Sequence, residues 1–218
     1  MNIRYTVLLV TAIAMASCKN NDNVFPKKVS SYLNVVNASA DTLNVYLNGT
    51  RQNNTTSLFP GGQSFYITVP AGTQNYSFKK AGSPNVLFSV PLNLKDSVDN
   101  SIYVTGETAT GSFTSVDVPR ADSVHAALRF VNASSDAGSL DVAVGDSLKF
   151  FPAVAFKSAT AFLPVGGGQK RIRVYLAGAA NAAIDTTITI VPSNAYSLFS
   201  EGSVNNKNKT FKIGVANF

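Results

Sequence analysis

The clearest pattern along this chain is an alternation of apolar and polar residues with a period of two. It appears in Leu33-Asn-Val35-Val-Asn, in Leu43-Asn-Val45-Tyr-Leu47 and again in Ile172-Arg-Val174-Tyr-Leu176. Strands with one buried face have this period, whereas an amphipathic helix repeats about every 3.6 residues. Turn sequences such as Asn48-Gly49 and Pro60-Gly-Gly62 separate the alternating stretches. Short strands at this spacing predict an antiparallel β-sandwich.

One of these alternating stretches occurs twice. Leu33-Asn-Val-Val-Asn-Ala-Ser39, followed by Asp41, returns as Leu128-Arg-Phe-Val-Asn-Ala-Ser134, followed by Asp136. The two copies are 95 residues apart in the sequence. Solenoid repeats have periods of roughly 20 to 50 residues, so an offset of this length indicates that a whole domain has been copied.

The duplication divides the chain into two tandem domains. We predict the first sandwich over residues 31–117 and the second over residues 123–218, with a short and stiff connection that contains Pro119. Turns and strands of the two halves match throughout, and Glu107 is predicted to correspond to Glu201 at the end of the last long strand before the C-terminal hairpin. The predicted fold is therefore all-β, with two immunoglobulin-like sandwiches in series.

The first residues have the features of an export segment. Arg4 precedes an apolar stretch too short to span a bilayer comfortably, and small residues then lead to Cys18, the only cysteine of the chain. This arrangement resembles a bacterial lipobox, which implies a cleaved signal peptide over residues 1–17 and a diacylglycerol anchor on Cys18. Residues 18–30 form a polar tether. The alternative is an ordinary secretory signal with an incidental cysteine.

A lipid anchor at Cys18 would make the membrane the first partner of the chain. We expect a cell-envelope protein held at the outer membrane, and the periplasmic and the surface-exposed face both remain open. The full sequence has a formal net charge of +6. Its basic residues are scattered and are not interleaved with aromatic ones, so the sequence does not predict nucleic-acid binding.

Candidate catalytic and metal-binding residues are few. His125 is the single histidine, and Glu107 and Glu201 are the two glutamates. An imidazole metal site or a Ser-His-Asp triad would need partners that the sequence does not offer. We therefore predict no enzyme activity, no metal and no cofactor. Asp41 and Asp136 are expected to bond to the backbone of their own loops, with Asn37 and Asn132 in related roles.

Five aspartates are followed by Ser or Thr and then by an aliphatic residue or Thr. The pattern resembles the acceptor of a general O-glycosylation system of some Gram-negative bacteria. The alternative is that these dipeptides close turns before a strand. The candidate acceptors are Thr42, Ser97, Ser123, Ser147 and Thr186.

The second copy carries a family resemblance in Phe130-Val-Asn-Ala-Ser134, Asp136, a short strand and a Pro-Gly turn. This combination resembles the domain of unknown function 4397 (DUF4397) family, over about residues 30–110 and 125–202. The resemblance implies immunoglobulin-like modules in exported bacterial proteins, often in tandem, and it supplies no catalytic residues.

We therefore expect a non-catalytic lipoprotein that presents two modules to a glycan or a protein partner. The alternative is an accessory subunit of a nutrient-uptake or adhesion assembly that binds by sheet-edge addition. Strand tyrosines are candidates for a binding surface, although such residues are core at least as often. They are Tyr46, Tyr66, Tyr76, Tyr103 and Tyr175.

Overall fold

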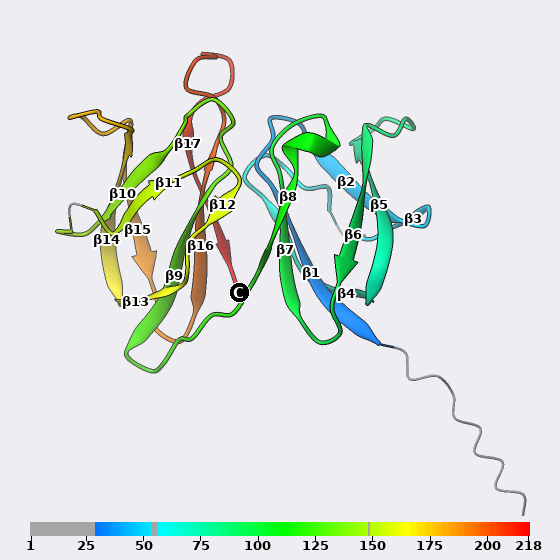
Figure 1. The fold of residues 1–218 in the computed structure, drawn as a ribbon, viewed down its shortest axis with the longest axis horizontal. Helices are drawn as coiled ribbons and strands as arrows, with labels where there is room; N and C mark the ends of the chain where they lie inside the picture. The colour runs from blue at the N-terminus through cyan, green and yellow to red at the C-terminus, as the bar shows by residue number, and fades with distance from the viewer. Residues whose placement is uncertain (1–28, 54–55, 148) are drawn as a thin grey trace, which may run out of the picture.

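The structure, a computed structural model, describes residues 29–53, 56–147 and 149–218. These residues form two β-sandwiches that lie side by side (Figure 1). The predicted signal peptide 1–17 and the lipid attachment at Cys18 lie outside the described residues, as does nearly all of the tether 18–30. In the described ranges, no helix has the length and apolar character needed to cross a membrane.

The first sandwich is built from eight strands and one short 3-10 helix. They are β1 (Ser30–Asn37), β2 (Leu43–Leu47), β3 (Thr50–Arg51), β4 (Gln63–Pro70), β5 (Gly72–Lys80), β6 (Phe88–Leu94), β7 (Asp99–Val104), η1 (Ala109–Gly111) and β8 (Phe113–Val116). The inner sheet has the order β4-β1-β7-β8 and the outer sheet the order β3-β2-β5-β6. Leu33, Val45 and Phe78 are among the apolar residues that fill the space between the two sheets.

The second sandwich repeats this plan. Its strands are β9 (His125–Asn132), β10 (Leu140–Val144), β11 (Phe151–Val154), β12 (Ser158–Ala159), β13 (Leu163–Gly166), β14 (Gly168–Leu176), β15 (Ile184–Ile190), β16 (Ala195–Glu201) and β17 (Lys212–Asn217). The inner sheet has the order β12-β9-β16-β17, with β13 also paired to β9, and the outer sheet the order β11-β10-β14-β15. Leu128, Val142 and Val174 belong to its core.

The predicted all-β fold with two sandwiches is confirmed, with one refinement of the strand directions. In each inner sheet the first strand pairs in parallel with the strand that precedes the C-terminal hairpin strand, β1 with β7 and β9 with β16. The other strand pairs are antiparallel. Parallel neighbours need a long crossover, and here the chain passes through the outer sheet before it returns.

The two copies also share a β-bulge on the inner sheet. In the first sandwich the hydroxyl of Ser64 accepts a hydrogen bond from the N–H of Val35 at 2.9 Å. In the second, the hydroxyl of Thr160 accepts one from the N–H of Phe130 at 3.0 Å. The pairing of β1 with β4 shifts register at this place. Bulges of this kind bend a strand locally, and the bulge was thus duplicated with the fold.

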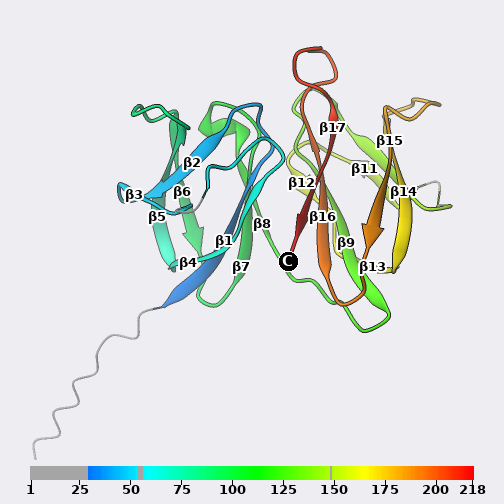
Figure 2. The same cartoon turned by 180° about the vertical axis from the view of Figure 1, so that it is seen from behind.

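The two inner sheets face each other, so that the molecule is four sheets deep (Figures 1 and 2). Val36 and Tyr103 of the first sandwich pack with Val131, Phe199 and Ala216 of the second. Val36 and Val131 are equivalent positions of the repeat, as are Tyr103 and Phe199. The interface therefore uses the same face of each copy and has approximate two-fold symmetry, like the isologous interface of a homodimer.

Candidate interdomain site

A buried ion pair joins the two sandwiches. The Arg129 side chain on β9 is only 1% exposed, and its Nη2 lies 2.5 Å from Oδ1 of Asp117, which follows β8. Arg129 also donates from Nε to the Ser197 hydroxyl at 2.6 Å and from Nη2 to the Tyr103 hydroxyl at 3.1 Å. Its guanidinium carbon lies 4.5 Å from the centre of the Phe162 ring. Because these partners come from both sandwiches, Arg129 fixes the placement of one sandwich relative to the other.

The carboxylate of Asp117 is surrounded by donors. Besides Arg129, it accepts hydrogen bonds from Ser101 at 2.5 Å, Tyr66 at 2.7 Å and Ser115 at 3.2 Å. A buried charge is tolerated when its remaining lone pairs are satisfied in this way. Burial, followed by the hydrogen bond to Asp117, raises the pKa of the Tyr66 phenol. The Tyr66 hydroxyl is therefore a permanent donor to Asp117.

The repeated asparagine organises the corner loop after the first inner strand. In the first copy the Asn37 amide donates to the carbonyls of Asp41 at 2.7 Å and Leu58 at 2.8 Å. Its own carbonyl accepts from the Ser39 N–H at 3.0 Å. The corner thus ties β1 to two loop segments, and this confirms that the asparagine holds the loop.

The second copy uses its asparagine in the same way. The Asn132 amide donates to the carbonyls of Gly138 at 2.8 Å and Val154 at 2.9 Å, and its carbonyl accepts from the Ser134 N–H at 3.2 Å. The Ser200 hydroxyl adds a fourth contact at 3.0 Å. The predicted equivalence of the two asparagines is therefore confirmed in detail.

Asp136 was expected to bond to its own loop, but it mainly holds a different one. Its carboxylate accepts from the Ser203 hydroxyl at 2.6 Å and from the N–H groups of Val204 at 3.1 Å and Asn205 at 3.0 Å. Burial raises the pKa of Asp136, but these hydrogen bonds outweigh it and hold the pKa below its usual range. Asp136 therefore positions the loop between β16 and β17.

Asp41 also differs from its predicted role. Lys80 Nζ lies 3.1 Å from Oδ2 of Asp41 and 3.1 Å from Oε1 of Glu107. Hydrogen bonds to Glu107 and then to Asp41 raise the pKa of Lys80. In the first copy Asp41 therefore forms a surface ion pair, whereas the equivalent Asp136 of the second copy holds a loop.

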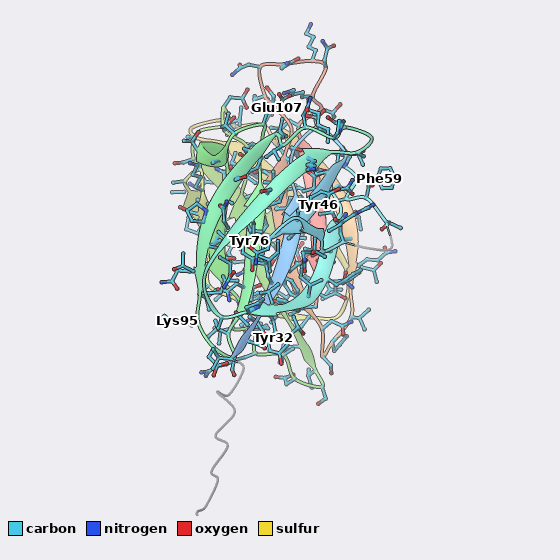
Figure 3. The ribbon with its side chains drawn as sticks, turned by 90° about the vertical axis from the view of Figure 1, so that its right-hand side faces the viewer. Tyr32, Tyr46, Phe59, Tyr76, Lys95 and Glu107 are labelled. Atoms are coloured by element: carbon cyan, nitrogen blue, oxygen red, sulfur yellow. The ribbon has the colours of Figure 1, made fainter. Side chains whose placement is uncertain are left out.

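A groove of about 450 Å³ lies between the corner loops of the two sandwiches. The strands β1, β7, β9 and β16 all end at this side of the molecule, opposite the start of β1 (Figure 1). Figure 3 shows Glu107 at this end of the first sandwich and Tyr32 near the other. The groove is lined by Ser39, Ala40, Asp41, Pro60, Thr105, Gly106, Glu107, Glu201, Gly202, Asn208, Lys209, Thr210 and Lys212.

Glu201 is the most buried acid of the groove. Its side chain is 4% exposed, and its Oε1 lies 3.2 Å from Nζ of Lys212. Burial raises the pKa of Glu201. It packs against Gly61 of the first sandwich. A residue with a side chain at position 61 would place its Cβ only 2.9 Å from Oε1 of Glu201, and the φ of +81° at Gly61 also favours glycine. Glu201 is thus a contact between the sandwiches as well as a lining residue.

The predicted equivalence of Glu107 and Glu201 is wrong. Val104 and Ser200 each lie opposite the repeated asparagine of their own sheet. Thr105 therefore occupies the position of Glu201, and Glu107 lies two residues further along a loop. The loop lengths differ between the copies, so a similar spacing in the sequence gave a false match. The groove nevertheless brings both glutamates together.

A family model described as "Domain of unknown function (DUF4397)" matches residues 31–143 and 126–215. The chain belongs to the DUF4397 family. Two overlapping matches agree with the two DUF4397 sandwiches and their repeated asparagine corners. No curated protein sequence matches the chain.

Solved structures with some similarity to this DUF4397 chain include two carbohydrate-binding modules. One is a family 41 module from streptococcal virulence factors, described for alpha-glucan recognition, with 11% identity and a TM-score of 0.28 over 78% of this chain and 92% of that one. The other is a family 26 module of Eubacterium rectale Amy13K in complex with maltoheptaose, with 11% identity and a TM-score of 0.26 over 84% and 96%. These values are low, and we assign no residue of the DUF4397 site from them.

The five tyrosines predicted as a binding surface do not gather into an exposed patch. Tyr76 and Tyr103 are fully buried, and Tyr66 is engaged with the interdomain ion pair. Tyr46 and Tyr175 are half-buried on the outer sheets of different sandwiches, and Figure 3 shows Tyr46 and Tyr76 in the first. The sequence did not predict the groove, and none of the described residues that line it is aromatic.

His125 begins β9 and contacts the linker. Its backbone N–H donates to Oδ1 of Asp122 at 2.7 Å, and its Nδ1 lies 3.1 Å from the same oxygen. The N–H groups of Val124 and His125 lower the pKa of Asp122. Among the residues with described positions, no group of three His, Cys, Asp or Glu side chains could hold a metal ion.

The candidate glycosylation residues differ in accessibility. Ser97, Ser123 and Ser147 are exposed, and Thr42 is half-buried. Thr186 is half-buried on the inward face of β15, opposite the buried Ile172. O-glycosylation of these residues stays a prediction. Thr42 and Thr186 are less accessible to a modifying enzyme than the three serines.

Proposed function

We propose that this protein is a non-catalytic lipoprotein of the cell envelope that binds a polar ligand in the groove between its two sandwiches. Cys18 would carry the lipid anchor, with the outer membrane as the site of attachment. The ligand would be a glycan or an extended segment of a partner protein. The observation that carries this proposal is the groove itself, because both repeats contribute to it at the end of the molecule opposite the start of β1.

The interdomain contacts support a binding role because they make the groove rigid before a ligand arrives. Arg129 and Asp117 are held by both sandwiches, and Asp136 holds the loop that carries Asn208 and Lys209. A site that is already ordered loses less conformational entropy on binding. Side-chain amides, hydroxyls and ammonium groups in the lining suit a ligand with many hydrogen-bonding groups.

The charges of the groove do not form a catalytic pair. Glu107 is bonded to Lys80, and Glu201 is paired with Lys212. A glycoside hydrolase would need two carboxylates that flank the bond to be cleaved, one of them an acid and the other a free base or nucleophile. Here each carboxylate already has a lysine partner, so we favour binding over hydrolysis.

Binding can be tested with the full-length chain in detergent against a glycan array and a peptide library. We expect one ligand class to be retained and to be lost in the variant Lys209→Glu with Asn208→Ala. Lys207→Glu is the matched control, because Lys207 is exposed in the same loop but does not line the groove. Retention that is unchanged by the groove variant, or absent for every ligand, would contradict the proposal.

The anchor is tested separately. We expect palmitate labelling of the chain, accumulation of the precursor in the presence of globomycin, and release from membranes after Cys18→Ala. A Cys18→Ala chain that stays bound to membranes as firmly as the wild type would exclude a lipid at this position.

A role as accessory subunit of a surface nutrient-uptake or adhesion assembly is the second candidate. The observation that favours it is the edge of β15. Among the residues that the structure describes, no strand pairs with the outer side of β15, so that side is free for strand addition.

A further inference from the structure

The outer edge strand of the second sandwich lacks the protection that its counterpart in the first sandwich has. β6 and β15 are equivalent strands of seven residues, and each forms an edge of its outer sheet. Pro91 lies in the middle of β6 opposite Asn75, whereas Thr187 lies in the middle of β15 opposite Arg171. Proline removes a backbone donor and is a common means of blocking an edge against further strands.

The other sheet edges in the described part of the chain are shorter than β15 or are interrupted by a proline or a bulge. β3 and β12 have two residues each, and β11 contains Pro152. β4 has the bulge at Ser64 with a φ of +55° at Phe65, and β13 contains Pro164. β8 has four residues, and β17 has six and ends where Gln63 of the first sandwich donates to the Asn217 carbonyl at 3.2 Å. Among these described edges, β15 is the longest strand that has neither a proline nor a bulge.

The composition of β15 also favours pairing. Its residues are Ile184, Asp185, Thr186, Thr187, Ile188, Thr189 and Ile190, which include no proline, no glycine and a single charge. Ile and Thr favour strands. Ile184 and Ile188 pack against the core but are only partly buried, so an added strand would cover more of them. Asp185 is already neutralised by Arg171, whose Nε lies 2.8 Å from Oδ1.

We propose that β15 pairs antiparallel with β15 of a second copy of this chain. A two-fold axis at Thr187 places Thr187 opposite its own copy and Asp185 opposite Thr189, while Ile184 faces Ile190. No like charges meet in this register, and opposed threonines are a favourable cross-strand pair. The strand is therefore complementary to itself.

The backbone supports the same register. Pro91 interrupts no pairing of β6 with β5, so its nitrogen points away from β5. By equivalence the N–H of Thr187 points away from β14, and the N–H groups of Asp185 and Thr189 do as well because strands alternate. The axis at Thr187 pairs these outward-facing residues with one another, as a hydrogen-bonded antiparallel ladder requires. The two outer sheets would become one continuous sheet.

The pairing has a geometric consequence for the two anchored ends. β15 lies beside β14 at the edge of the outer sheet, and the two strands are antiparallel (Figure 2). An antiparallel pair reverses one molecule, so the starts of the two β1 strands point to opposite ends of the dimer. Such a dimer suits copies held on two facing surfaces. A single strand pair buries less area than a stable interface usually does, so we expect association only at micromolar concentration or above.

The test is sedimentation equilibrium of the full-length chain in density-matched detergent. We expect a reversible dimer for the wild type. Thr187→Pro and Thr187→Lys should each associate at least about tenfold more weakly, because one loses a donor and the other opposes two like charges. Thr189→Ser is the matched control and should still dimerise.

A charge exchange tests the register and excludes misfolding as the cause. Thr187→Lys and Thr187→Glu should each self-associate more weakly than the wild type, and an equimolar mixture should form a heterodimer more readily than either variant dimerises alone, since residue 187 faces residue 187. A wild-type chain that is monomeric at about 100 μM, or a mixture that stays monomeric, would overturn the proposal.

Discussion

The two sandwiches share a fold and a corner, but they differ at one position of the interface. Asn34 on β1 and Arg129 on β9 are equivalent residues of the repeat, and both lie on the face that meets the other sandwich. Arg129 forms the buried ion pair with Asp117, while the Asn34 amide donates to Gln63 at 3.0 Å. Gln63 in turn contacts Asn217 of the second sandwich.

The difference shows how a symmetric interface becomes asymmetric after duplication. Near a two-fold axis, two arginines would be opposed to each other, and like charges in a buried place are costly. Asp117 follows β8, and Phe218 holds the equivalent position after β17, since their N–H groups bond to the equivalent carbonyls of Asp99 and Ala195. A single carboxylate is therefore present, and it can neutralise one arginine. One copy therefore carries the charge, and the other carries a neutral amide that needs no counter-ion.

The largest expected effect comes from breaking the ion pair. Arg129→Met leaves Asp117 buried without its cation, and we expect a loss of about 3–5 kcal/mol in the free energy of unfolding. Asn34→Ala, the matched change in the other copy, should cost about 1–3 kcal/mol, because it leaves one partner unsatisfied. Both values can be measured by urea unfolding of the full-length chain. Equal losses would show that the two positions do not differ as the structure indicates.

A companion variant removes both charges. Arg129→Met with Asp117→Asn should recover most of the lost stability, since replacing a buried ion pair by neutral groups is often close to neutral. If the double variant is as unstable as Arg129→Met alone, the cost lies in packing around Arg129 and not in the unpaired carboxylate.

The second prediction concerns the corner that the copies share. Asn37→Asp and Asn132→Asp keep an acceptor but lose the amide donors to two backbone carbonyls. Each should lower the free energy of unfolding by about 1–3 kcal/mol, because buried carbonyls are left without partners. Similar losses are expected in the two copies, and Asn181→Asp at an exposed position is the control. A large loss in one copy only would mean that the corner has diverged.

Sequence reasoning reached the fold because its determinants are local. The alternation and the turns predicted the strands, and the repeated Asn37 and Asn132 predicted the corner. The interface could not be predicted, because a strand such as β9 is buried on both faces only when a second sandwich covers it. Its partner Asp117 lies at the predicted end of the first domain, where the nearest arginine in the sequence is Arg120 and no pattern indicates Arg129 as the partner.

The groove escaped prediction for a related reason. It forms where loops of the two copies meet, and contacts between the copies join residues far apart in the sequence, such as Gln63 and Asn217, which are 154 residues apart. The match of Glu107 with Glu201 was derived from sequence spacing alone, and differing loop lengths made it wrong. Both glutamates nevertheless line the groove, although their environments differ greatly.

That contrast gives the third prediction. The pKa of Glu201 is raised in the folded chain, so the folded state holds the proton more tightly than the unfolded state. Its contribution to stability is therefore present at pH values below the unfolded pKa and is lost as pH rises through the folded pKa. In the variant Glu201→Gln, the free energy of unfolding should therefore fall less steeply as pH rises. Unfolding free energies measured from pH 4 to pH 8 should show it as a difference between variant and wild type.

Glu107→Gln is the matched change at the exposed position. It should leave the pH profile of stability close to that of the wild type, because surface substitutions usually change stability by less than about 0.5 kcal/mol. A Glu107 variant that alters the profile as much as Glu201→Gln would contradict the assignment of this pH dependence to the buried Glu201.

A smaller effect than at the ion pair or the corner is expected at the shared bulge. Ser64→Ala and Thr160→Val each remove the hydroxyl that accepts the N–H of the first inner strand, at Val35 and at Phe130. A hydrogen bond of this kind contributes about 0.5–1.5 kcal/mol, so the losses should be small and similar. Ser115→Ala removes one hydroxyl that donates to Asp117 at 3.2 Å. The stability lost in this variant is the reference value for one weak hydrogen bond. If Thr160→Val costs much more than Ser64→Ala, the bulge beside Arg129 also helps to place Phe162 on the guanidinium. The asymmetry of the interface would then extend from the ion pair into the backbone.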